Sequence, residues 1–348
     1  MPSSSNPASL LPDFTGLTVD RYNFVRVLGS GAFGKVYLAR DTTTGDHYAA
    51  KCMVQANAGT QADIDQEREI ALHYAVHEHT NVVSFVEHFT YQGYVFVIME
   101  YVPGGDLLDA IERGLFHGKP ELVKTTMSQV LDAVEFLHKN GIFHRDIKPQ
   151  NILCNEDGSH LRLTDFGFAT QSRISRRACG TPAYVPPESF EYTVDSHSPR
   201  AGDMWALAVL LLNLVIGRHA WDSAEHDNHH YATFLNNEDY LESGLGLSAE
   251  LSALLKRCFD ADATRRPTIA EMRRELDSIE SFSDGRLGPQ QAVPPPSSSS
   301  RTIIEFDSSD WDEEESESGT PDSTPPATPP MVHIEIAVHV EVDEKKTC

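Results

Sequence analysis

The stretch FHRDIKPQNILCNEDGSHLRLTDFG, residues 143–167, gathers two aspartates, an asparagine and a lysine in a loop, a short hairpin and a second loop. Asp146 can accept a proton from a hydroxyl group, while Asn151 and Asp165 carry oxygen atoms of the kind that divalent cations bind. Phosphoryl transfer needs a proton acceptor and metal ligands side by side. The stretch therefore holds most of a candidate active site.

A glycine-rich segment, LGSGAFGKV at residues 28–36, lies upstream between two runs that are typical of strands. Glycine has no Cβ, so such a hairpin can close tightly over phosphate groups. The pattern alone also fits a plain glycine-rich hairpin. A strand follows it rather than a helix, which favours a lid over ATP and not a dinucleotide-binding turn.

A lysine follows in the apolar run Tyr48–Cys52, and Lys51 needs anionic partners if its ammonium group is buried there. The next helical segment offers Glu67 and Glu69. We favour Glu69, because the sequence after it continues in the usual way from helix to strand, and Glu67 remains open.

The first third of the chain is rich in β-branched and aromatic runs, which indicate strands separated by turns. These runs are residues 24–28, 36–40, 47–53, 82–89 and 94–101. One helix, Asp63–Val76, interrupts them. We therefore expect a five-stranded antiparallel sheet with one helix packed on it.

Helical periodicity dominates after residues 103–105. Apolar residues recur at three- and four-residue spacing from Val123 to Leu137 and stop at Asn140-Gly141. Further helices are expected at 204–216, 248–259 and 269–279, and the run 204–217 is too short for a membrane span and suits a buried core helix. The fold class is α+β, with one domain of two lobes over 21–282, the first at 21–102 and the second at 103–282.

Both ends of the chain have compositions that disfavour a core. Residues 1–20 are expected to be disordered, as is most of the acidic, Pro- and Ser-rich tail at 283–348. Residues 332–342 alternate apolar and polar side chains, which fits either a strand that pairs with a sheet edge or a disordered end.

Charge and cysteine content limit the function classes. A formal net charge of −24 argues against nucleic-acid and anionic-membrane partners, and the five scattered cysteines indicate neither a disulfide framework nor a zinc site. No signal peptide is recognisable, so we expect a soluble, monomeric protein in the cytoplasm, the nucleus or both. His226, His229 and His230 suit a loop better than a metal site.

Together these motifs resemble the eukaryotic protein kinase superfamily over about residues 22–280. The glycine loop, the strand lysine, HRDIKPQN, DFG at 165–167, Pro-Pro-Glu at 186–188, Asp-Met-Trp at 203–205 and Arg-Pro at 266–267 follow kinase order. The loops between residues 179 and 268 are also similar to a fungal group of kinases tied to nutrient response and meiotic control.

The resemblance implies a role for each matching residue, with ATP and Mg²⁺ as cofactors. Asp146 matches the catalytic base, Lys148 the cation on the transferred phosphoryl group, and Asn151 and Asp165 the magnesium ligands. Lys51 and Glu69 match the pair that orients the phosphates. The other implied ATP-binding residues are Leu28, Gly29, Ser30, Gly31, Ala32, Phe33, Gly34, Val36, Ala49, Met99, Glu100, Val102, Asp106 and Leu153.

The resemblance also implies the class of acceptor. Lys148 and the run Cys179–Pro182 are similar to the corresponding residues of serine/threonine kinases, and Thr181 in that run matches a further catalytic residue. Protein substrates with Ser or Thr hydroxyls are therefore expected. Asp106 can receive an arginine upstream of the acceptor, whereas Gln150 is uncharged where a glutamate is common. A preference for basic substrates is only weakly indicated.

Regulation departs from the family pattern. Arg145 suits an activation-loop phosphate, yet Arg177 stands where a phosphorylated threonine commonly lies. Ser172 and Ser175 are the remaining candidate phosphosites. The basic run 173–177 fits equally an internal substrate mimic or a solvated loop.

Two further positions bear on the active arrangement. His73 takes the place of an apolar residue in the internal stack, which predicts a weaker or pH-sensitive site if the helix is aligned correctly. Glu188 has its expected partner in Arg266, and loss of this buried pair is expected to be strongly destabilising.

Two alternatives stay open beside an active serine/threonine kinase. A pseudokinase scaffold would bind partners through its lobes and the segment 332–342, and a small-molecule kinase would share the fold. Lys51, Asp146, Asn151 and Asp165 are all present and favour activity. Thr181-Pro182 and Pro-Pro-Glu at 186–188 favour a peptide platform.

Overall fold

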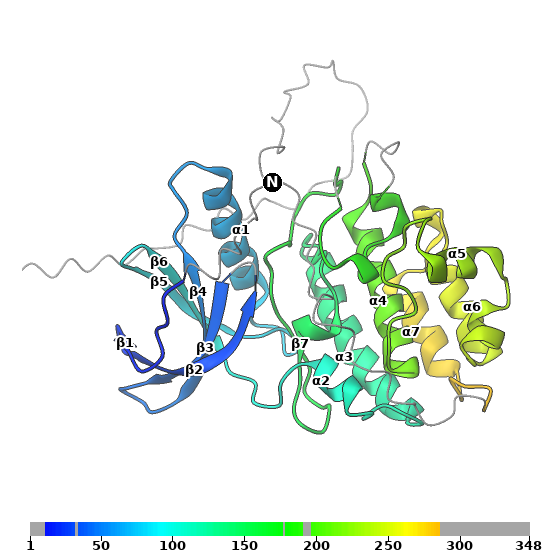
Figure 1. The fold of residues 1–348 in the computed structure, drawn as a ribbon, viewed down its shortest axis with the longest axis horizontal. Coiled ribbons are helices and arrows are strands. Elements are labelled where there is room, and N and C mark those ends of the chain that lie inside the picture. The colour runs from blue at the N-terminus through cyan, green and yellow to red at the C-terminus, as the bar shows by residue number, and fades with distance from the viewer. Residues whose placement is uncertain (1–10, 32–33, 177, 191–195, 286–348) are drawn as a thin grey trace, which may run out of the picture. The chain divides into compact units, whose positions relative to one another are not determined.

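The computed structural model describes residues 11–31, 34–176, 178–190 and 196–285 (Figure 1). Ala32, Phe33, Arg177 and the strand expected at 332–342 lie outside these ranges, so nothing is concluded about them. Within them, a β-rich N-terminal lobe is followed by a helical C-terminal lobe, as the sequence predicted.

The N-terminal lobe is an antiparallel sheet with the strand order β1-β2-β3-β4-β6-β5. Its strands are β1 (Thr18–Val19), β2 (Tyr22–Gly31), β3 (Gly34–Asp41), β4 (His47–Val54), β5 (Phe85–Tyr91) and β6 (Tyr94–Glu100). Successive side chains point to opposite faces. One face buries Tyr37, Cys52 and Phe96, and the other buries Ala49, Met99 and Ile70 of helix α1. The sheet thus has two apolar faces.

Helix α1 (Gln61–Val76) begins at Thr60, whose side chain accepts a hydrogen bond from the Asp63 backbone N–H. This cap satisfies one of the free donors of the first turn. The buried residues of α1 include Ile70 and His73. The helix was predicted at 63–76, and its position brings Glu69 next to β4.

The segment at residues 11–20 differs from the expected disorder. Leu11 and Phe14 are each only 5% exposed, and Val19 is buried in β1. Phe14 contacts a ring cluster that includes Phe24 and Phe96. The prediction was wrong for this part, because two apolar residues in a polar stretch are too few to stand out before a receiving surface is known.

The strand expected at 82–89 begins later, since β5 starts at Phe85. Val82 and Val83 leave the sheet of the N-terminal lobe and pair with Leu163 through backbone contacts, including a Val83 N–H to Leu163 carbonyl bond of 2.9 Å. Leu163 lies in β8 (Arg162–Leu163), which pairs with β7 (Ile152–Leu153). These contacts link the lobes directly before Asp165.

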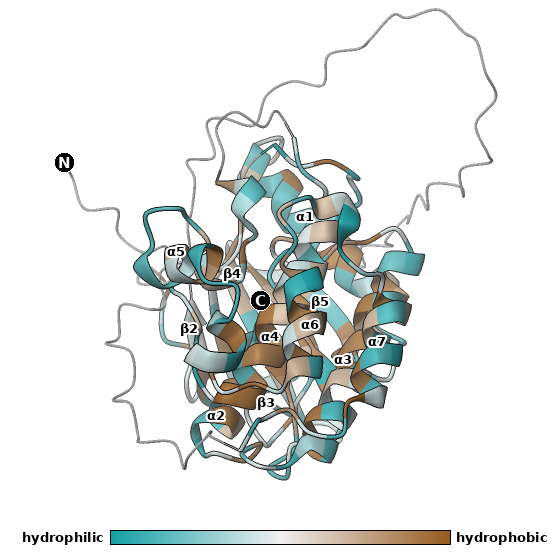
Figure 2. Cartoon of the chain, turned by 90° about the vertical axis from the view of Figure 1, so that its right-hand side faces the viewer, coloured by the Kyte–Doolittle hydropathy of each residue, from teal (hydrophilic) through white to brown (hydrophobic). Residues whose placement is uncertain are grey.

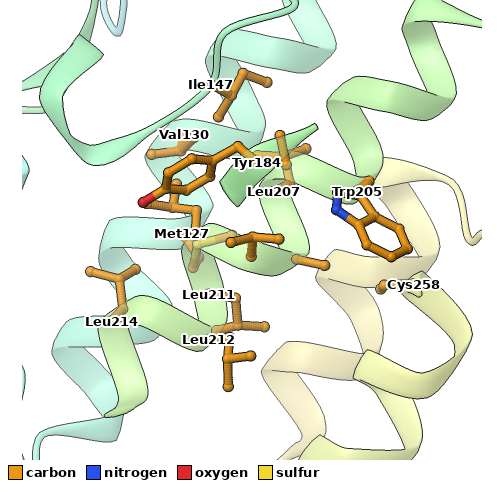
Figure 3. Close-up of a cluster of buried hydrophobic side chains, with 14 of the residues drawn as sticks. Met127, Val130, Ile147, Tyr184, Trp205, Leu207, Leu211, Leu212, Leu214 and Cys258 are labelled. Atoms are coloured by element: carbon orange, nitrogen blue, oxygen red, sulfur yellow. The ribbon is translucent and has the colours of Figure 1, made fainter. Parts of the chain in front are cut away.

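Helix α4 (Pro199–Ile216) is the centre of the C-terminal lobe. Fourteen of its residues are buried, and its apolar side chains meet those of neighbouring elements in one cluster (Figure 3). In Figure 2 this helix is largely brown, while α7 shows teal residues. Among the described residues, α4 alone has the length and hydropathy of a membrane span, but it is the buried core helix that the sequence predicted.

The remaining helices of the C-terminal lobe contribute side chains to the same buried cluster. They are α2 (Leu107–Glu112), α3 (Pro120–Lys139), α5 (His229–Asn236), α6 (Ala249–Cys258) and α7 (Ile269–Ser278), with short 3₁₀ or π turns η2 (Pro149–Asn151), η3 (Pro182–Tyr184), η4 (Pro187–Ser189), η5 (Tyr240–Gly244) and η6 (Ala263–Arg265). The expected His-rich loop is therefore partly wrong, because His229 and His230 open α5. Asn228 caps that helix, and Tyr231 is buried.

Candidate active site

The loop that carries His144, Arg145 and Asp146, here called the catalytic loop after its predicted role, is anchored to helix α4 through Asp203. Its carboxylate accepts hydrogen bonds from the backbone N–H groups of His144 (3.0 Å) and Arg145 (2.8 Å), and from His138 Nε2 (2.8 Å). Asp203 is 1% exposed. Arg145 is held at φ 67°, a left-handed backbone that a non-glycine residue adopts only when its surroundings impose it. The buried carboxylate therefore fixes the loop just before Asp146.

Asp146 lies at the centre of a hydrogen-bonded group. Lys148 Nζ donates to its Oδ2 (2.7 Å), Asn151 Nδ2 to the same oxygen (2.9 Å), and the Thr181 N–H and hydroxyl to Oδ1 (each 3.1 Å). Lys148 Nζ also donates to Thr181 Oγ1 (2.7 Å). Asp146 is 3% exposed. The structure thus brings together the four predicted catalytic residues.

Gly180 allows this close approach. A Cβ at this position would lie 2.6 Å from the Arg145 carbonyl oxygen, and its φ is +99°. Only glycine fits such a backbone at such a distance. The stretch that follows Asp165 and contains Ser175 and Thr181 is here called the activation segment. It can therefore bring Thr181 against the catalytic loop.

Lys51 joins the two lobes. Its Nζ lies 2.5 Å from Glu69 Oε1 in α1 and 3.0 Å from Asp165 Oδ1. Burial favours the neutral amine, but the two carboxylates outweigh it and raise the pKa of Lys51. The pKa of Asp165 is lowered, because the nearby Lys51 ammonium overcomes the effect of burial. The structure selects Glu69 over Glu67 as the partner of Lys51.

The donor set fits a magnesium ion. Asn151 donates through Nδ2 to both the carbonyl and the carboxylate of Asp146, so its amide oxygen is the atom suited to a metal. Asp165 supplies an ionised carboxylate, and its backbone has a φ of 65°. Carboxylate and amide oxygens are ligands that Mg²⁺ accepts.

The residues expected around adenine lie together under the sheet. Ala49 and Met99 belong to its buried α1-facing cluster, and Leu28, Val36 and Leu153 pack against that cluster. Val102 is buried, and the Glu100 N–H donates to the Ser84 carbonyl (2.9 Å). Gly29, Ser30, Gly31 and Gly34 close the β2-β3 hairpin, in which Gly31 pairs with Gly34.

Asp106 lies at the entrance to helix α2, where its side chain accepts from the Asp109 N–H (3.0 Å). Burial raises the pKa of this carboxyl to about 6, and the Asp109 carboxylate adds to the rise. A backbone bridge joins Asp106 to Leu153. The Asp106 backbone therefore lies beside Leu153, one of the residues expected around adenine.

His73 occupies the place in the internal stack that the sequence predicted for it. Its ring stacks on Phe166 (centroids 4.9 Å apart, 15° between planes), and Phe166 in turn contacts His144 (5.2 Å). His73 Nε2 donates to the Val83 carbonyl (2.7 Å). Burial lowers the pKa of His73 to about 4, so its ring is neutral near pH 7. A polar residue is accommodated here because its donor has a partner.

The activation segment bends back onto the catalytic loop at Ser175. Arg145 Nη2 donates to Ser175 Oγ (2.9 Å), and Ser175 exchanges two backbone hydrogen bonds with His197 (2.8 and 2.7 Å). Ser172 is exposed, and its hydroxyl donates to the Ile174 carbonyl instead. Of the two candidate phosphosites, Ser175 is thus the one whose hydroxyl binds Arg145.

Arg266 and Glu188 form the expected pair in two parallel hydrogen bonds of 2.7 Å. The guanidinium also donates to the carbonyls of Asp260 and Ala201, and it lies over the Trp205 ring. Two carboxylate oxygens and two carbonyls thus satisfy a buried cation. The pair ties η4, which follows the activation segment, to the core of the lobe.

The sequence did not reveal the contacts of two side chains, those of His138 and Lys35. The sequence assigned no role to His138, although its side chain lies beside Asp203. Lys35 was assigned to the glycine loop, yet its ammonium donates to the Leu11 carbonyl (2.9 Å). Neither contact has a sequence signal, because each partner is far away in the chain.

Comparisons with known proteins agree with this geometry. The sequence model of the protein kinase domain matches residues 22–276. A fission yeast (Schizosaccharomyces pombe) protein, the negative regulator of sexual conjugation and meiosis, is 32% identical over 311 residues, which cover 83% of this chain and 65% of that protein. The serine/threonine-protein kinase ksp1 of the same yeast is 38% identical over 212 residues, 57% of this chain and 44% of that protein.

A third relative, the serine/threonine-protein kinase VHS1 of Saccharomyces cerevisiae, is 28% identical over 353 residues, covering 82% of this chain and 76% of that protein. The chain spans less than two thirds of the length of the other two relatives. The predicted similarity to fungal kinases is confirmed at this level. With a domain match that covers most of its length, the chain belongs to the protein kinase family.

Proposed function

We propose that this protein is a serine/threonine protein kinase that transfers the γ-phosphoryl group of Mg·ATP to hydroxyl groups of protein substrates. One observation carries the proposal: Lys51 bridges Glu69 and Asp165, while Thr181 of the activation segment forms a hydrogen-bonded group with Asp146 and Lys148 of the catalytic loop. A scaffold has no need of both arrangements. The names of the fungal relatives support the same activity class.

The proposed chemistry depends mainly on position and charge. Bound Mg²⁺, held by Asn151 and Asp165, would neutralise charge on the phosphates. Lys51 orients the phosphates, and Glu69 keeps its ammonium in place. Asp146 receives the proton of the acceptor hydroxyl, and Lys148 stabilises negative charge on the transferred group.

Thr181 supports the assignment of the acceptor class. Its hydroxyl donates to Asp146 and accepts from Lys148, so the activation segment is joined to both groups that would face the acceptor. The hydroxyl group of a substrate Ser or Thr would lie beside the same Asp146 carboxylate. We propose these two residue types as the acceptors.

The surroundings of Asp106 support basic protein substrates as the preferred class. Asp109 and Glu112 add negative charge near its carboxyl, which favours a cation there.

The contact between Arg145 and Ser175 supports activity without a loop phosphate. The guanidinium already holds the activation segment through the serine hydroxyl, in the arrangement that also joins Thr181 to Asp146. We therefore propose that the unphosphorylated protein is competent.

The test is transfer of labelled phosphate from Mg·ATP to arrays of degenerate peptides that carry a single Ser, Thr or Tyr. We expect label on Ser and Thr peptides and none on Tyr peptides. Asp146→Ala and Lys51→Ala serve as inactive controls. No transfer above these controls would overturn the proposed function.

A further inference from the structure

Residues 11–19, here called the N-terminal strap, end in strand β1 and bury Leu11 and Phe14 against the face of the sheet that holds Tyr37 and Phe96, here called the outer face. Phe14 contacts four aromatic rings, Phe24, Tyr37, Tyr94 and Phe96, at centroid distances of 5.2 to 6.2 Å. The strap is also bound through its backbone, since Gly16 N–H donates to the Phe24 carbonyl (2.7 Å) and Phe24 N–H to the Leu17 carbonyl (2.9 Å). The segment is thus part of the folded N-terminal lobe.

Strand β3 holds the start of the strap through two side chains. Lys35 Nζ donates to the Leu11 carbonyl (2.9 Å), and the Tyr37 hydroxyl donates to the Pro12 carbonyl (3.2 Å) and accepts from the Phe14 N–H (3.4 Å). Both side chains lie on the outer face, whereas Val36 between them packs against the inner cluster. The side chain of Lys35 therefore points away from the nucleotide site.

Lys35 also lies at the base of the glycine-rich hairpin. It pairs with Ser30 in β2 and with Cys52 in β4, and its neighbour Gly34 pairs with Gly31. A Cβ on Gly34 would lie 2.3 Å from the Cys52 carbonyl oxygen, so the hairpin is already pressed against β4 here. The Lys35 contact adds an attachment on the opposite face. The hairpin base is consequently fixed from both sides.

The family comparison does not account for the strap. The match to the protein kinase domain begins at residue 22, after the strap has ended. The strap is thus a feature of this chain beyond the matched domain, although three of its residues, Leu11, Phe14 and Val19, are as buried as core residues.

We propose that the strap, through the bond from Lys35 to the Leu11 carbonyl, positions the glycine-rich hairpin for nucleotide binding. The strap restrains the described base of the hairpin, Gly29–Gly31 and Gly34–Val36, so less conformational freedom is lost when nucleotide binds there. Lys35 acts as a positioning residue and touches no reacting atom. This proposal rests on ATP binding as part of the proposed function.

The experiment measures Mg·ATP binding by calorimetry and the split between KM and kcat in full-length variants. Lys35→Met, which removes one ammonium group but little packing, is expected to raise Kd and KM for ATP about three- to tenfold. The kcat value should stay within about twofold of wild type, because no group at the reacting atoms has changed. Lys35→Arg should restore binding.

Phe14→Ala is expected to raise KM in the same way, while Leu17→Ala is the matched control, since Leu17 belongs to the strap but is 53% exposed. Hydrogen exchange at residues 28–31 should rise in Lys35→Met. Unchanged Kd in Lys35→Met would overturn the proposal, even if Phe14→Ala unfolds the protein. Failure of the wild type to bind Mg·ATP would instead overturn the proposed function.

Discussion

At the scale of the residue, His73 places an ionisable ring in an apolar stack. The ring packs on Phe166, and its one bonded nitrogen reaches the Val83 carbonyl. Val83 also donates to Leu163, two residues before Asp165. The His73 side chain, one turn after Glu69, thus links helix α1 to the segment that carries Asp165.

His73 should make the fold sensitive to acid. Because its pKa is about 4 in the folded protein, against 6.5 for a solvated histidine, the unfolded chain binds more protons between these values. Stability therefore falls as the pH drops through 6.5 towards 4. We expect wild type to lose about 2 kcal/mol more unfolding free energy than His73→Leu between pH 7.5 and 5. Urea unfolding at both pH values measures this difference, and equal losses would contradict the assignment.

Asp106 should tune the use of basic substrates. Asp106→Asn keeps a side-chain oxygen for the α2 cap but removes the charge, so KM for arginine-containing peptides should rise about tenfold with no change for neutral peptides. In wild type the same rise should appear as the pH falls through about 6, because the carboxyl becomes protonated. An equal effect on neutral peptides, or on KM for ATP alone, would place Asp106 in nucleotide binding instead.

Ser175 should matter as a hydroxyl and not only as a phosphate acceptor. Phosphatase-treated wild type is expected to be active, and Ser175→Ala should lower kcat about fivefold, since Arg145 loses its bond to the activation segment. Ser172→Ala is the control, because that hydroxyl bonds within its own exposed loop. Activity that appears only after phosphorylation of either serine would refute this prediction.

At the scale of the element, the sequence predicted helices and strands where their pattern is local. The run 123–137 gave α3 with its end at Asn140, and 204–216 gave the buried part of α4. The sequence did not predict the strap, because Leu11 and Phe14 are buried only by their contacts with the rings of β2, β3 and β6. The predicted start of β5 was wrong by a few residues, because Val82 and Val83 pair with β8 instead of β6. Long-range pairing decides such cases, and no local pattern reports it.

The link between η4 and the core of the C-terminal lobe depends on one ion pair. Arg266→Met leaves the Glu188 carboxylate buried without its partner, and we expect a loss of about 3–5 kcal/mol in unfolding free energy. Arg257→Met removes a comparable but half-exposed pair with Glu275, and should cost less than about 1 kcal/mol. Denaturant unfolding of both variants compares them. Similar losses in the two would contradict a special role for Arg266.

At the scale of the whole molecule, each lobe supplies part of one site. The N-terminal lobe brings Lys51 and Glu69, and the C-terminal lobe brings Asp146, Asn151 and Asp165, with the bond from Lys51 to Asp165 across the boundary. The identities of these residues were predictable from motif and spacing. The contacts that bring these residues together were not predictable, because the same sequence fits both an open and a closed arrangement of the two lobes. The structure adds that α1 is held inwards by Glu69 and His73 together.

The central claim is that this closed arrangement transfers phosphate. The most direct measurement is a single-turnover assay, in which purified wild type and Asp146→Asn are mixed with γ-labelled Mg·ATP and a serine peptide. We predict transfer by wild type and a rate at least about 10²-fold lower for Asp146→Asn, while both bind Mg·ATP equally. Equal rates in the two proteins, or nucleotide binding without any transfer by wild type, would contradict the account.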